Sequence, residues 1–117
     1  MTGSSGEDLE QLVRAMTERR KRDPLGFLAE VLEGIWLESD ENDVEFLWRH
    51  RLRNAPWWAE NALLAIEAVL ADPPGNLCDL IEEHAGRGVS HDGLMYGGQS
   101  CLAWLASQLD RLRAIRP

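Results

Sequence analysis

The stretch NAPWWAENALLAIEAVLADPP, residues 54–74, decides which fold this sequence can adopt. Between positions 56 and 71 nearly every residue is apolar or small, and the interruptions are Glu60, Asn61 and Glu67. Glu60 and Glu67 are seven positions apart and therefore share one narrow face of a helix. A helix that is apolar around most of its circumference is buried by neighbours on several sides. We therefore expect residues 56–71 to form a central helix.

Both ends of this helix are marked in the sequence. Asn54 is a candidate N-cap, Pro56 suits a first helical turn, and Asp72-Pro73-Pro74 stops the helix. The side chains expected to be buried along it are Leu63, Ile66, Val69 and Leu70.

Five further helices follow from apolar residues at the spacing of a helix face. Their inward residues are expected to be Leu9, Leu12, Val13 and Met16; Leu28, Val31, Leu32 and Ile35; Val44, Leu47, Trp48 and Leu52; Leu77, Leu80 and Ile81; and Leu102, Leu105, Leu109 and Leu112. Asp23 and Ser100 are expected N-caps. Residues 86–98 hold five glycines without a sustained period and predict a long loop, with a short extended piece at 94–96.

These elements predict an all-α protein, a single compact domain of about six helices around the central helix 56–71. The helical domain is expected to cover residues 7–117, after a flexible N-terminus at residues 1–6. The 117 residues suffice for one such domain.

Composition limits which cellular compartment and which class of binding partner are expected for this protein. No run of about 18 apolar residues is present, and the N-terminus lacks a basic region followed by an apolar one, so neither a membrane span nor a secretory signal is predicted. The formal net charge of −8 opposes general affinity for nucleic acid and for anionic membranes. Without a signal, Cys78 and Cys101 are expected to be reduced thiols in a cytoplasm.

The sequence offers two candidate features for binding a protein partner. The first is an acidic stretch without nearby basic residues, comprising Glu38, Asp40, Glu41, Asp43 and Glu45. It can attract a basic partner, or serve only solubility. The basic run at residues 19–22 can likewise be a solvated helix end or a nucleic-acid patch.

The second feature is the tryptophan content, five in all. Trp36, Trp48 and Trp104 lie near apolar faces and are expected in the core. Trp57 and Trp58 are adjacent and point about 100° apart, so both need not be fully buried. An exposed tryptophan is a typical interface anchor, although a boundary residue packed on a preceding loop fits the pattern too.

Catalytic and metal sites have weaker support. A hydrolase would draw on His91, Asp92, Ser100 and Cys101, but the nucleophile elbow motif is missing. A metal site would need to use Cys78, His84, His91 and Cys101. Cys78 and His84 are six positions apart, roughly 240° around a predicted helix, so they cannot converge without breaking that helix. The glycines of the loop follow neither a predicted strand nor the Walker spacing. We expect no enzyme activity and no cofactor.

Residues carrying helix packing resemble those of small bacterial immunity proteins of contact-dependent growth inhibition and similar polymorphic toxin systems. The similarity covers residues 57–74, Leu77, residues 80–84 and a following glycine, with Tyr96, Gly98, Leu102, Trp104 and Leu105. The resemblance implies a cytoplasmic, non-catalytic protein that binds one toxin domain, often a nuclease, and blocks it. No binding residue can be transferred from the family, because such proteins vary most where they bind.

The sequence therefore predicts an immunity protein whose acidic surface covers a basic toxin domain. The expected partner-binding residues are Glu38, Asp40, Glu41, Asp43, Glu45, Trp57 and Trp58. The partner is expected to be a protein rather than nucleic acid or membrane. The alternative is a helical adaptor or regulatory subunit that binds another protein. Oligomeric state does not follow from the sequence.

Overall fold

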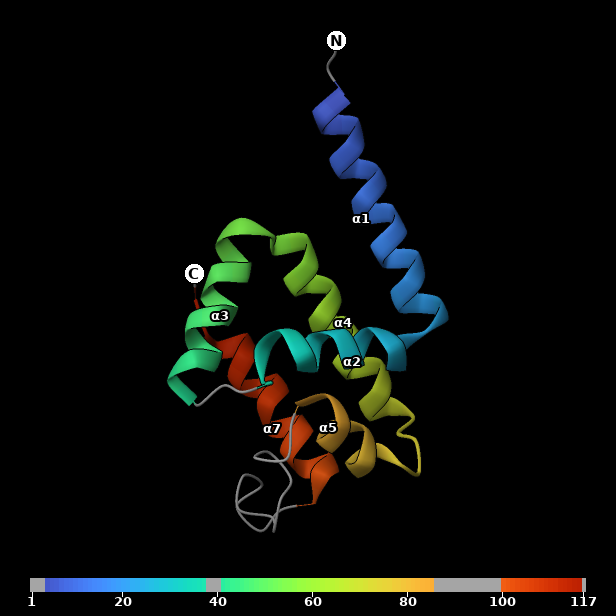
Figure 1. The fold of residues 1–117 in the computed structure, drawn as a ribbon, viewed down its shortest axis with the longest axis vertical. Coiled ribbons are helices and arrows are strands. Elements are labelled where there is room, and N and C mark those ends of the chain that lie inside the picture. The colour runs from blue at the N-terminus through green and yellow to red at the C-terminus, as the bar shows by residue number, and fades with distance from the viewer. Residues whose placement is uncertain (1–3, 38–40, 86–99, 117) are drawn as a thin grey trace.

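The computed structural model of the chain describes residues 4–37, 41–85 and 100–116. This part of the chain is all-α and forms a single domain, which confirms the predicted fold class. Its helices are α1 (Ser4–Arg22), α2 (Pro24–Ile35), α3 (Glu41–Asn54), α4 (Pro56–Ala71), α5 (Leu77–Ala85) and α7 (Cys101–Ala114) (Figure 1). The predicted glycine-rich loop and its extended piece lie outside the described residues.

Helix α4 lies at the centre and contacts α1, α2, α3 and α7. Its bounds match the predicted residues 56–71. Much of its buried surface is made by small side chains, since Ala59, Ala62 and Ala65 are at most 1% exposed. Ile66 is fully buried among them. The expectation that neighbours surround this helix on several sides is confirmed.

Helix α2 crosses α4 and also packs on α5. Asp23 caps it as predicted, because its Oδ1 accepts a hydrogen bond of 2.9 Å from the backbone N–H of Gly26. The four predicted inward residues, Leu28, Val31, Leu32 and Ile35, are all fully buried. The predicted core tryptophans are buried as well: Trp36, Trp48 and Trp104.

Several local predictions were wrong. The N-cap of α4 is Ala55 without a side-chain hydrogen bond, because the amide of Asn54 donates back to the carbonyl of His50 at 2.9 Å. Leu63 is only half-buried because it lies beside, and not within, the face formed by the buried alanines; Leu70 is also half-buried. Leu102 is 41% exposed, since the inward face of α7 is centred on Cys101, Trp104 and Leu105.

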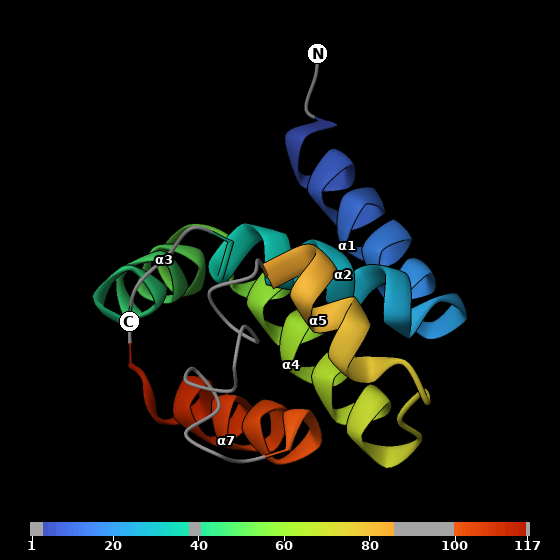
Figure 2. The ribbon, with the colours of Figure 1, turned by 60° about the horizontal axis from the view of Figure 1, so that its bottom comes forward.

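Helix α1 leaves the body of the protein. It begins at Ser4, three residues before the sequence predicted, and its first half extends beyond the other helices in both views (Figures 1 and 2). Its second half is held by Arg20, whose Nε donates a 2.7 Å hydrogen bond to Oδ1 of Asn61 on α4. Asn61 is buried, and its own amide donates to the carbonyl of Trp57. Leu9 and Leu12, predicted to point inward, are 46% and 48% exposed.

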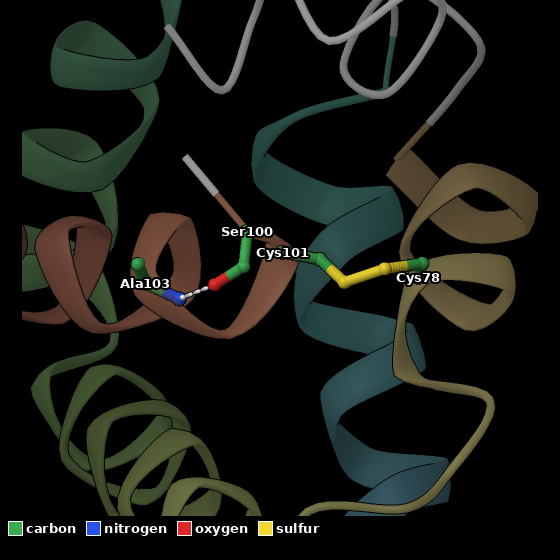
Figure 3. Close-up of a disulfide and its surroundings, with 4 residues drawn as sticks. All are labelled: Cys78, Ser100, Cys101 and Ala103. Carbon is green, nitrogen blue, oxygen red and sulfur yellow. Dashed lines mark hydrogen bonds between the residues drawn. A yellow bond between two sulfur atoms is a disulfide. The ribbon is translucent and has the colours of Figure 1, made fainter. Parts of the chain in front are cut away.

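A disulfide joins α5 to α7. Cys78 and Cys101 are bonded, and their Cα atoms are 5.5 Å apart, within the usual range for a disulfide (Figure 3). The prediction of two reduced thiols was therefore wrong. Two cysteines separated by 23 positions meet because α5 and α7 pack side by side, and no local sequence pattern encodes this contact.

Candidate functional site

The predicted acidic surface is described only in part. Asp43 is exposed and Glu45 is half-buried, both in the first half of α3. Glu38 and Asp40 lie outside the described residues, and Glu41 is described by its backbone alone, as the first residue of α3. The described acidic groups therefore lie on one short helical segment.

Phe46 directly follows that segment on α3 and was missed at the sequence level. Its side chain is 65% exposed, the largest exposed fraction among the large apolar side chains described. Val44 and Trp48 are buried on the inner face of α3 at 2% and 0% exposure. Phe46 is two positions from each, hence about 160° around the helix from that face. This offset from the inward residues is the signal that could have identified it.

The outer face of α3 thus changes along its length from an acidic to an apolar and then to a basic side chain. Asp43 precedes Phe46 by one turn, and the exposed Arg49 follows it by one turn. The Nε of Arg49 donates to the backbone carbonyl of Arg116, 3.2 Å away, which holds the C-terminal end of the chain against α3. An exposed aromatic ring with charged neighbours on both sides is typical of a protein contact surface.

The two adjacent tryptophans have different surroundings. Trp58 is 8% exposed; its ring lies 6.4 Å from that of Trp48 and is covered by the Arg51 guanidinium, 4.2 Å from the ring centroid. This places Trp58 in the core and removes the reason for expecting it to contact a partner. Trp57 is half-buried and packs against the core. Only one of the two is therefore buried, which agrees with the expectation that both need not be.

The basic run of α1 is partly engaged within the chain. Nη2 of Arg19 lies 2.5 Å from Oε1 of Glu30 on α2, and this hydrogen bond raises the pKa of Arg19 above its ordinary value. Arg20 is bonded to Asn61, as described above. Arg19 and Arg22 also line a hollow of about 300 Å³ at the α1–α2 corner, together with Asp23 and Phe27. Two of the four basic side chains therefore position α1.

The residues considered for catalysis have structural roles where they are described. Ser100 caps α7, since its hydroxyl accepts a 3.1 Å hydrogen bond from the N–H of Ala103, and Cys101 is in the disulfide (Figure 3). His91 and Asp92 lie outside the described residues. His84 places Nδ1 3.2 Å from the Glu33 carboxylate. No group of three metal-ligating side chains occurs within the described ranges.

Comparison with protein-family models, with curated proteins and with solved structures gives no match. Within the part of the chain that the structure describes, no helix has the length and apolarity needed to cross a membrane.

Proposed function

We propose that this protein is an immunity protein that binds and neutralises a cognate bacterial toxin domain, and that the outer face of α3 is its contact surface. The observation that carries the choice of surface is the 65% exposure of Phe46 next to the acidic start of the helix. Aromatic side chains are frequent anchors of protein interfaces, and surrounding charges steer association. The resemblance of the helix-packing residues to immunity proteins supports the choice of partner.

In this proposal the toxin domain presents an apolar pocket for Phe46 and a basic patch for Asp43 and the acidic residues that precede α3. Toxin nucleases need basic surface to bind their substrate, so an acidic helix can cover that surface and exclude the substrate. The alternative function, a helical adaptor, would use the same exposed ring but would not protect cells from a toxin.

The test uses a cognate toxin domain, to be sought in the reading frames next to this gene. Phe46→Ala should weaken binding by about 2 kcal/mol, roughly 30-fold, since the ring loses its pocket. Titration calorimetry with the purified toxin domain measures this change, and growth of cells producing the toxin reports protection. Leu102→Ala, at an exposed apolar position on α7, is the matched control and should bind as wild type. Unchanged affinity of Phe46→Ala would contradict the proposed surface.

Asp43→Lys tests the electrostatic part separately. We expect a slower association rate and a weaker salt dependence with little change in the dissociation rate, because exposed charges at an interface rim act mainly on encounter. Stopped-flow association at two salt concentrations measures both. Equal association rates for wild type and Asp43→Lys at low salt would exclude steering by this end of α3.

The proposed compartment is the cytoplasm, and the disulfide bears on it directly. Disulfides persist mainly in oxidising compartments, so the bond between Cys78 and Cys101 removes the earlier support from reduced thiols. Alkylation of free thiols in intact cells decides the matter: two labelled cysteines support a cytoplasmic site of action, and protected cysteines indicate an oxidising compartment.

A further inference from the structure

The first half of α1 extends beyond the other helices of the described residues, so none of those helices covers its exposed side (Figures 1 and 2). Every side chain from Asp8 to Leu12 is exposed, whereas Val13, Met16, Thr17 and Arg20 in the second half are half-buried. Leu9 and Leu12 keep nearly half of their surface exposed on a helix whose periodicity is otherwise that of a packed element. Exposed leucines at this spacing are typical of a helix that pairs with another helix.

Four exposed residues form a stripe along this side, which we call the α1 stripe: Asp8, Leu12, Ala15 and Arg19. At 100° per residue they fall within a sector of about 60°, and Asp8 and Arg19 are about 16 Å apart along the axis. Leu9 and the half-buried Met16 border the stripe and add apolar surface.

The α1 stripe is complementary to itself. Positions 8 and 19 lie at equal distances from the point between residues 13 and 14. Positions 12 and 15 also lie at equal distances from this point. When two copies pair antiparallel about this point, Asp8 faces Arg19 of the second copy and Leu12 faces the small side chain of Ala15. A parallel pair would instead place Asp8 against Asp8, and like charges at a helix seam are unfavourable.

We propose that the protein self-associates through an antiparallel pair of α1 helices with the α1 stripe at its centre. The occupant of the uncovered side is a second copy because charge and side-chain size both match in that orientation. Arg19 keeps its bond to Glu30 and gains Asp8 of the second copy as a further partner. This surface is separate from the outer face of α3.

The expected dimer is weak. Two helices touching over about three turns bury less than the roughly 1,200 Å² typical of stable complexes. We therefore expect the full chain to be monomeric at low micromolar concentration and to approach twice 13.2 kDa only at higher concentration. Sedimentation velocity over a concentration series up to about 1 mM measures the association constant. A constant mass of 13.2 kDa over that series would overturn the proposal.

Charge exchange tests the orientation. Asp8→Arg alone and Arg19→Asp alone should each weaken self-association about tenfold, since each places like charges together twice per dimer. A mixture of the two variants should associate at least as well as wild type, because every contact in the antiparallel mixed dimer is then between opposite charges. A mixture that associates no better than either variant alone would overturn the antiparallel pairing.

Two controls keep the result specific. Glu30→Gln removes the ion pair between Arg19 and Glu30, which Arg19→Asp also loses. Arg14→Glu reverses an exposed charge that lies about 100° or more around α1 from the α1 stripe. Both should associate as wild type, whereas Ala15→Glu should abolish pairing. Unchanged self-association of Ala15→Glu would overturn the pairing of two copies through α1. The pairing would also be overturned if the wild type stayed monomeric and Ala15→Glu bound the toxin domain more weakly.

Discussion

Helix α4 and the first half of α1 both carry apolar residues at helical spacing, but their surroundings are opposite. Helix α4 is contacted by α1, α2, α3 and α7, and its central residues Ala62, Ala65 and Ile66 are fully buried. Leu9 and Leu12 of α1 lie at the same kind of spacing and remain nearly half exposed. Periodicity therefore identifies which side of a helix is apolar, but it does not say whether the same chain supplies the cover.

The largest effect should come from the centre of α4. Ile66→Ala should lower the free energy of unfolding by about 2–5 kcal/mol, because the site is fully buried and the lost methyl groups leave a cavity. Urea denaturation followed by tryptophan fluorescence measures the change. Leu64→Ala, on the same helix but 36% exposed, is the control and should cost less than about 1 kcal/mol. Equal losses at the two positions would contradict the central place of α4.

An intermediate effect on the free energy of unfolding is expected from the disulfide that joins the 9-residue helix α5 to α7. The double variant Cys78→Ala/Cys101→Ala should lose about 3 kcal/mol of unfolding free energy, since the disulfide restricts the unfolded chain over a separation of 23 positions. Urea denaturation with and without reductant measures this loss. Reductant should destabilise wild type and leave the variant unchanged; identical curves for wild type in both conditions would show that packing alone holds α5.

The smallest effect on the free energy of unfolding is expected in the first half of α1. Leu12→Ala should change the free energy of unfolding by no more than about 0.5 kcal/mol at low protein concentration, because the side chain is 48% exposed and alanine favours the helix. Thermal unfolding at low concentration measures it. A loss comparable to that of Ile66→Ala would mean that the first half of α1 is packed in solution, and the contrast between the two helices would disappear.

The elements that sequence reasoning found are those with local signals. The bounds of α4 were predictable because Pro56 and the Asp72-Pro73-Pro74 stop act on the backbone itself. The caps at Asp23 and Ser100 were found for the same reason, since each bonds an N–H three residues away.

The features that sequence reasoning missed depend on contacts between distant segments. The disulfide needs α5 and α7 side by side, and Trp58 is buried partly because Arg51 of α3 covers its ring. The exposure of Phe46 is an intermediate case, since its offset from Val44 and Trp48 was available in the sequence. Of the acidic stretch, the structure describes the side chains of Asp43 and Glu45 alone.

The alanines of α4 also limit how this protein can change over time. A helix that buries Ala59, Ala62 and Ala65 lets its neighbours approach closely, and an added methylene there has no free volume to enter. Substitutions that increase side-chain volume on α4 should therefore be rejected during divergence, even when they increase hydrophobicity. The outer face of α3 carries no such limit on volume, so sequence change should accumulate there, where the proposed toxin partner binds.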